Sequence, residues 1–153
     1  MRLILACDPD GGIGYENRLP WSNIQGDLPR FKRLTDGQTV IMGRNTWDSL
    51  PKKPLPGRVN IVVSSRPLEA EHHNVIRSPE LRFNRPDDVS FWLIGGAKLV
   101  ESYWNEIDEV HLTRVYDHYT CDTFIDLLKL EQEFLCWFKE HLTDHSYEIW
   151  KRK

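Results

Sequence analysis

The stretch "TVIMGRNTWDSLPKKPLPGRVNIVVSS" (residues 39–65) begins and ends with a short, β-rich apolar run. In both runs, "TVIMG" (39–43) and "VNIVVSS" (59–65), apolar residues occupy consecutive positions, which is typical of strands buried on both faces of a largely parallel sheet. The segment between them predicts a short helix over 46–50. This order of strand, helix and strand indicates an α/β open sheet.

Similar runs extend the pattern along the chain. Further strands are predicted at 2–7, 89–96 and 109–116, and further helices at 25–35 and 97–104. "FLCWFKEHL" and "SYEIWKRK" predict two antiparallel strands around the turn "TDHS". The polar stretch 64–88 predicts loops with one strand around 74–76, not a domain boundary. We therefore expect a single domain over 1–153, an α/β sheet covered by helices on both faces and ending in an antiparallel hairpin.

Composition and charge exclude several classes of protein. The chain has 153 residues, 40% hydrophobic and 28% charged, which is typical of one soluble globular domain. A net charge of -3 gives no reason to expect a nucleic-acid or membrane partner. The apolar run at the amino terminus is too short for a signal peptide, so a cytoplasmic location is expected. Cys7, Cys121 and Cys136 are odd in number and form no CxxC, which predicts reduced thiols and no metal site.

An acid stands on an apolar stripe in "LPWSNIQGDLPRFKRLT" (19–35). On a helix, Asp27, Phe31 and Leu34 fall at i, i+4 and i+7 and share one inward face. A carboxylate among Leu28, Phe31 and Leu34 is costly to desolvate unless it is hydrogen-bonded. Asp27 is therefore predicted to have a bonding partner.

Three strand ends resemble anion-binding junctions. "GRNTW" (43–47) and "IGGAK" (94–98) join a strand to a helix through glycine, and "VVSSR" (62–66) ends a strand with two hydroxyls and a cation. Taken alone, "GRNTW" is more simply an ordinary strand-to-helix turn, "VVSSR" is equally consistent with the start of a loop, and "IGGAK" is a weak signal. Together they lie at the carboxyl ends of one predicted sheet, the edge at which open α/β sheets bind ligands.

Two other features carry weaker signals. "PLPGR" (54–58) is a rigid loop that presents Arg58, whose planar fork suits a carboxylate, although a surface turn with an exposed Arg is the simpler interpretation of this motif alone. His141 and His145 have i, i+4 spacing, but on a predicted strand and turn this spacing does not place them on one face. No role is assigned to either histidine.

Taken in order, these motifs resemble those of dihydrofolate reductase, of the bacterial type because the pocket acid is Asp. The matching segments are "GIGYENRLPW" (12–21), "DLPRFKRLT" (27–35), "VIMGRNTWDSLPKKPLPGR" (40–58), "NIVVSSRP" (60–67), "FWLIGGAKL" (91–99), "LTRV" (112–115) and "DTFI" (122–125). The resemblance implies a central eight-stranded, mostly parallel mixed sheet flanked by helices. It also implies reduction of 7,8-dihydrofolate to tetrahydrofolate with NADPH, in support of one-carbon metabolism and thymidylate synthesis.

The resemblance assigns roles residue by residue. The acid Asp27 would bind the ring N3–H and 2-amino group of the pterin, and Leu19 and Trp21 would complete the catalytic set on a mobile loop. The substrate would contact Ile4, Ala6, Leu28, Phe31, Leu50, Ile94 and Thr113, and Arg58 would clamp its glutamate carboxylate. NADPH would contact Ala6, Ile13, Gly43, Arg44, Asn45, Thr46, Ser64, Ser65, Arg66, Gly95, Gly96, Ala97, Lys98 and Leu99.

The chain also departs from the family pattern. Val100 replaces a frequent Tyr, Asn45 a frequent His, and Cys121 a usual glycine before Asp122. Two alternatives remain open: a riboflavin-pathway reductase of the same fold, and a non-catalytic nucleotide-binding protein. Asp27, Phe31 and Arg58 together favour a folate substrate, and a monomer is expected.

Overall fold

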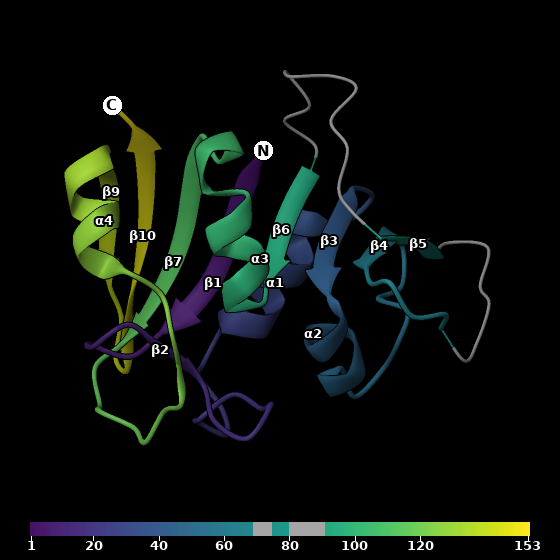
Figure 1. Cartoon of the computed structure of the whole chain (residues 1–153). Helices are drawn as coiled ribbons and strands as arrows, with labels where there is room; N and C mark the ends of the chain where they lie inside the picture. The colour runs from purple at the N-terminus through teal and green to yellow at the C-terminus, as the bar shows by residue number, and fades with distance from the viewer. Residues whose placement is uncertain (69–74, 80–90) are drawn as a thin grey trace.

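Eight strands form one mixed sheet in the computed structural model, which describes residues 1–68, 75–79 and 91–153 (Figure 1). The strands are β1 (Arg2–Cys7), β3 (Thr39–Gly43), β4 (Val59–Val63), β5 (Val75–Ser78), β6 (Phe91–Gly95), β7 (Glu109–Val115), β9 (Phe134–His141) and β10 (His145–Arg152). Their order is β5-β4-β3-β6-β1-β7-β10-β9. Neighbours from β5 to β7 are parallel, and β10 is antiparallel to both β7 and β9. The predicted sheet and its carboxyl-terminal hairpin are confirmed.

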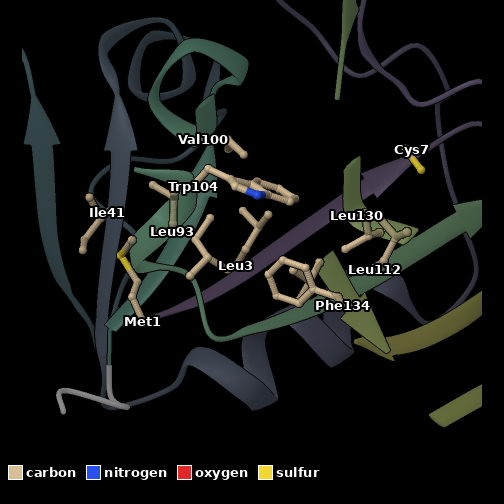
Figure 2. Packing of buried hydrophobic residues seen from close by; sticks show 12 residues of the cluster. Met1, Leu3, Cys7, Ile41, Leu93, Val100, Trp104, Leu112, Leu130 and Phe134 are labelled. Atoms are coloured by element: carbon tan, nitrogen blue, oxygen red, sulfur yellow. The ribbon is translucent and has the colours of Figure 1, made fainter. Parts of the chain in front are cut away.

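Helices cover both faces of this sheet, as predicted. One face carries α1 (Asp27–Thr35) and α2 (Arg44–Ser49), and the other carries α3 (Ala97–Ser102), the 3-10 helix η1 (Trp104–Glu106) and α4 (Leu127–Glu133). Alternation along β1 sends Leu3 into the second layer, where it packs in one cluster with Trp104 and Leu130 (Figure 2). Its neighbour Ile4 packs instead with Trp47 in the first layer.

Several element boundaries differ from the sequence prediction. Helix α1 begins at Asp27 rather than at 25 because Gly26 is in the left-handed region, with φ of 84°. Helix α2 begins two residues earlier than predicted. The single helix predicted at 97–104 is two elements, because the backbone leaves the α conformation at Tyr103. The strand predicted around 74–76 is present from Val75 onward, whereas residue 74, most of the loops predicted at 64–88 and the first two residues of the strand predicted at 89–96 lie outside the described residues.

Three elements were not predicted. Helix α4 begins after Asp126, whose side chain accepts a hydrogen bond of 3.0 Å from the Lys129 N–H and so caps the first turn. Strands β2 (Gly12–Gly14) and β8 (Thr123–Phe124) form a small antiparallel ribbon, too short to give a periodic signal.

In the described part of the chain, no helix is long and apolar enough to cross a membrane.

Candidate active site

The glycines that end strands β3 and β6 bring two predicted junctions together. The φ of Gly95 is 131°, a conformation that favours glycine, and a Cβ there would stand 3.2 Å from the Thr46 Oγ1. A Cβ on Gly43 would lie 3.6 Å from the backbone nitrogen of Gly96. The starts of α2 and α3 therefore meet at one sheet edge, with bare backbone between them. This surface fits a ligand that approaches the main chain closely.

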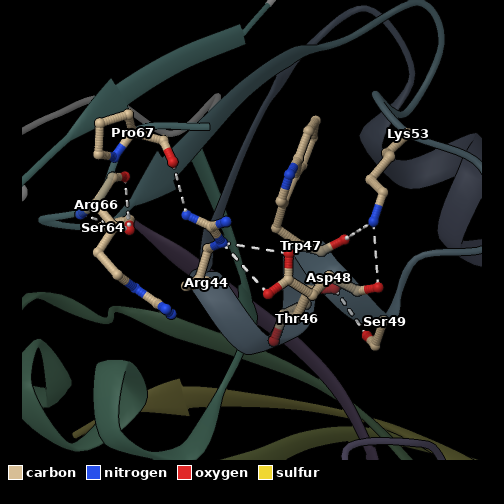
Figure 3. A network of polar contacts seen from close by, with 9 residues as sticks. All are labelled: Arg44, Thr46, Trp47, Asp48, Ser49, Lys53, Ser64, Arg66 and Pro67. Carbon is tan, nitrogen blue, oxygen red and sulfur yellow. Dashed lines mark hydrogen bonds and ion pairs between the residues drawn. The ribbon is translucent and has the colours of Figure 1, made fainter. Parts of the chain in front are cut away.

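Arg44 links this edge to the third junction. Its Nη1 donates to the Pro67 carbonyl over 3.1 Å, and its Nε lies 3.2 Å from the Asp48 Oδ1 (Figure 3). Within the turn, the Ser64 hydroxyl accepts from the Arg66 N–H and donates to the Arg66 carbonyl. Two guanidinium groups and serine hydroxyls thus come from neighbouring segments, an arrangement that suits a phosphate.

The acid on α1 has the partner that the sequence requires. Thr113 on β7 donates its hydroxyl to the Asp27 Oδ1 over 2.6 Å. The Asp27 side chain is 20% exposed, so the carboxylate keeps an open side. Ala6 on β1 lies opposite Thr113 in the parallel register, beside this pair.

Apolar residues predicted to contact the substrate gather on the same face of the sheet. Ile4, Leu50 and Ile94 all pack against the cluster that contains Trp47. Phe31 is half-buried on α1, and Leu28, next to Asp27, is 67% exposed. The apolar wall is therefore supplied mainly by the sheet and by the end of α2.

Arg58 is held at the far end of α1. It is buried, its Nη1 donates to the Thr35 hydroxyl over 3.0 Å, and its Nε donates to the Pro56 carbonyl over 2.9 Å. Burial lowers the pKa of Arg58, while the Asp36 carboxylate raises it. The buried side chain of Asn60, which sequence reasoning missed, accepts from the Leu55 N–H and donates to the carbonyls of Leu55 and Arg58. These hydrogen bonds hold the arginine in position.

The loop that contains Leu19 and Trp21 is tied to a second loop. The Asp122 carboxylate accepts from the Glu16 N–H over 2.9 Å, a hydrogen bond that lowers the pKa of Asp122, and the Asp122 N–H donates to the Gly14 carbonyl. Trp21 is buried with its ring 5.5 Å from that of Tyr119, whereas Leu19 is 55% exposed. A cleft of about 500 Å³ separates the loop tip from α2 and is lined by Glu16, Asn17, Arg18, Asn45, Asp48 and Ser49.

The base of this loop carries two contacts that were not predicted. The Asp8 carboxylate, which is buried, accepts from the N–H groups of Gly12 and Tyr119 over 2.8 and 3.2 Å and so joins the two loops. Cys121, the departure from the family's usual glycine, packs so closely that a Cβ on Gly12 would stand 2.3 Å from its sulfur. The thiol therefore fits only because residue 12 is glycine.

The remaining cofactor candidates divide between backbone and side chain. Ile13 is half-buried in β2, and Ser65 is exposed beside Ser64. On α3, Lys98 is exposed and Ala97 follows Gly96 directly. Leu99 packs against the cluster of buried residues that contains Trp104 and Leu130. Leu99 can therefore face a ligand at this edge only through its backbone.

Comparisons with known proteins point to one family. The sequence model of the family described as dihydrofolate reductase matches residues 1–149. The chain is 36% identical over 165 residues to dihydrofolate reductase type 8 of Escherichia coli, covering 100% of this chain and 96% of that protein. It is 35% identical over 125 residues to dihydrofolate reductase of Staphylococcus aureus, covering 81% and 76%.

A bifunctional dihydrofolate reductase-thymidylate synthase of Paramecium tetraurelia is 40% identical over 128 residues. The match covers 81% of this chain but 28% of that longer protein. The family match over nearly the whole chain and the identities to these relatives agree. The chain therefore belongs to the dihydrofolate reductase family, whose members use NADPH to reduce 7,8-dihydrofolate to tetrahydrofolate.

Proposed function

We propose that this chain catalyses that reduction through the site built around Asp27, as one domain over residues 1–153. The observation that carries the proposal is the pairing of an acid and an arginine along one helix. Asp27, held by Thr113, begins α1, and Arg58 contacts Thr35 at its other end. A pterin ring and a glutamate tail present complementary groups in the same order: hydrogen-bond donors at one end and a carboxylate at the other.

The acid would orient the pterin. With one oxygen accepting from Thr113, the Asp27 carboxylate has further acceptor sites for the ring N3–H and the 2-amino group. Ile4, Leu50 and Ile94 would pack against the ring and the benzoyl group, with Phe31 and Leu28 on the opposite side. Asp27 would favour protonation at N5 through the ring, and the proton itself would arrive through water, with Trp21 helping to hold that water.

The junctions at the sheet edge would hold the cofactor. When bound, NADPH supplies the hydride that passes from nicotinamide C4 to pterin C6. Arg44, Ser64, Ser65 and Arg66 would contact the adenosine 2′-phosphate, and the exposed backbone at Gly95 and Gly96, with Thr46, would contact the pyrophosphate. The contacts of Asp122 with Glu16 and Gly14 support closure of the loop of Ile13 and Leu19 over the nicotinamide.

Folate is favoured over the substrate of a riboflavin-pathway reductase for a specific reason. A ribosylamino-pyrimidine has no glutamate tail, whereas Arg58 is buried, hydrogen-bonded and poised for a carboxylate. A purely structural protein would need neither this arginine nor Asp27. The proposal includes a monomer in the cytoplasm with no nucleic-acid partner.

The test is a spectrophotometric assay with purified protein, NADPH and dihydrofolate, comparing the wild type with Asp27→Asn. The variant keeps the shape of the side chain but cannot carry its charge, so turnover at neutral pH should fall by about 100-fold or more, while NADPH affinity barely changes. Acid should partly restore its rate, because substrate already protonated in solution bypasses the missing group. Wild-type turnover in the variant, or no substrate-dependent loss of NADPH in the wild type, would refute the proposal.

A further inference from the structure

A buried arginine lies directly behind the proposed pterin acid. Arg30 is one turn after Asp27 on α1 and is 9% exposed. Its Nη1 stands 3.9 Å from the Asp27 Oδ1, the oxygen that also accepts from Thr113. A full positive charge at this distance acts on anything that binds to the carboxylate, because a partly buried site screens charge less than water does.

Contacts from β10 fix the position of this guanidinium. Both Nη atoms of Arg30 lie within hydrogen-bond distance of the His145 Nε2, at 3.2 and 3.3 Å, and the guanidinium carbon is 4.3 Å from the centre of the Tyr147 ring. Burial raises the pKa of Tyr147, which keeps the phenol neutral beneath the cation. Arg30 is therefore held on a neutral aromatic face.

Hydrogen bonds to both ring nitrogens orient the imidazole that holds Arg30. The Nε2 of His145 must keep its lone pair to accept from Arg30, so the ring proton is on Nδ1. That nitrogen is 2.6 Å from the Asp144 Oδ1, which accepts the proton's hydrogen bond and fixes the tautomer. Asp144 also accepts from the Gln25 N–H, just before α1. Asp144 and His145 thus hold the Arg30 guanidinium in place beside Asp27.

The charge of a ligand then decides how well it fits. A pterin is neutral and offers N–H donors to Asp27, whereas a 2,4-diaminopteridine is more basic and pairs with a carboxylate as a cation. We propose that Arg30 is a specificity-determining residue that favours neutral pteridines over protonated, cationic ones at Asp27. The inference rests on the proposed function, because it takes Asp27 as the partner of the pterin ring.

The experiment compares two ligands that differ in charge but carry the same tail. Dissociation constants of folate and of its 2,4-diamino analogue are measured by titration calorimetry for the wild type, Arg30→Met and Arg30→Lys. Removing the charge should tighten the diamino ligand relative to folate by roughly 10- to 100-fold, the size expected for like charges a few ångströms apart at an intermediate dielectric. Arg30→Lys keeps the charge and should keep the wild-type ratio within about threefold.

Two further variants separate charge from packing. Arg33→Met removes an exposed cation from the same helix and should leave the ratio unchanged. Arg30→Gln removes the charge but still offers a donor to His145, so it should reproduce the effect of Arg30→Met even if the methionine variant folds poorly. Circular dichroism confirms the folding of each variant.

The outcomes distinguish this inference from the proposed function. Equal changes for the two ligands in both neutral variants would show that Arg30 only packs, and would overturn the inference while leaving Asp27 as the pterin acid. If Asp27→Asn binds both ligands as tightly as the wild type, the proposed function itself fails. A shifted ratio in Arg33→Met equal to that in Arg30→Met would overturn the inference by attributing the effect to net charge.

Discussion

Replacement of Arg58 offers the clearest separation of binding from structure in the proposed site. The guanidinium already uses Nη1 for Thr35 and Nε for Pro56, and among the described residues its Nη2 has no acceptor. That nitrogen is the donor expected to meet the carboxylate of a glutamate tail. In Arg58→Leu the tail loses this charge-assisted contact.

The size of the effect follows from the contact that is lost. A hydrogen bond to a charged group contributes about 1.5–3 kcal/mol, so KM for dihydrofolate should rise roughly 10- to 150-fold with little change in kcat. A tail-less dihydropterin never makes this contact and should show nearly the same KM with wild type and variant. Arg58→Lys keeps the charge without the planar fork, so its KM for dihydrofolate should lie between those of the wild type and Arg58→Leu.

The same substitution has a predictable structural cost that serves as the control. Loss of the bonds to Thr35 and Pro56 should lower the free energy of unfolding by about 1–3 kcal/mol, measured by urea denaturation. Steady-state kinetics are therefore measured under conditions in which the variant is fully folded, well below its unfolding transition. An equal rise in KM for dihydrofolate and for the tail-less substrate would show that Arg58 only supports the loop, and the assignment of the tail site would be wrong.

Two more predictions concern the cofactor and the carboxyl-terminal hairpin. Arg44→Ala should reduce the preference for NADPH over NADH in kcat/KM by about 1–3 kcal/mol, and equal use of both cofactors by the wild type would contradict the phosphate assignment. Burial alone would raise the pKa of Glu148, but hydrogen bonds from Arg114, Ser146 and Trp150 lower it below the ordinary 4.5. Its contribution to stability is therefore present above pH 4.5 and lost as the pH falls through the folded pKa. Glu148→Gln should cost about 3–5 kcal/mol in urea denaturation at pH 7 and less in acid, whereas an equal cost at both pH values would refute this role.

The sheet was predictable because strands that are buried on both faces have apolar residues at consecutive positions in the sequence. Consecutive apolar residues in β3 and β6 indicated parallel strands at the centre of the sheet. The helices predicted between the strands indicated that both faces of the sheet are covered. Helix α4 was missed although Asp126 is a good N-cap, because its seven residues carry little periodic signal. Short segments such as β2 and β8 form only because tertiary contacts hold them.

The candidate site could be predicted where a single residue stands out from its sequence neighbours by its chemistry. Asp27 stood out because a carboxylate interrupts an apolar stripe, and the structure supplies Thr113 as its partner. Arg30 could not be assigned, since its partner His145 is 115 residues away in sequence. An i, i+4 spacing of histidines cannot reveal a contact between a helix and a distant strand.

Buried polar residues inside strands mark positions where a specific contact is needed. Asn60, Thr113 and Glu148 are polar residues inside strands of the sheet, and each is at most 5% exposed. Burial of a polar group is unfavourable unless it is hydrogen-bonded, so each such position implies a specific partner. Asn60 holds the backbone of Arg58, Thr113 holds Asp27, and Glu148 pairs with Arg114. Two of these three partners, Arg58 and Asp27, belong to the proposed substrate site. The loop and the helix that carry them therefore depend on the sheet for their position.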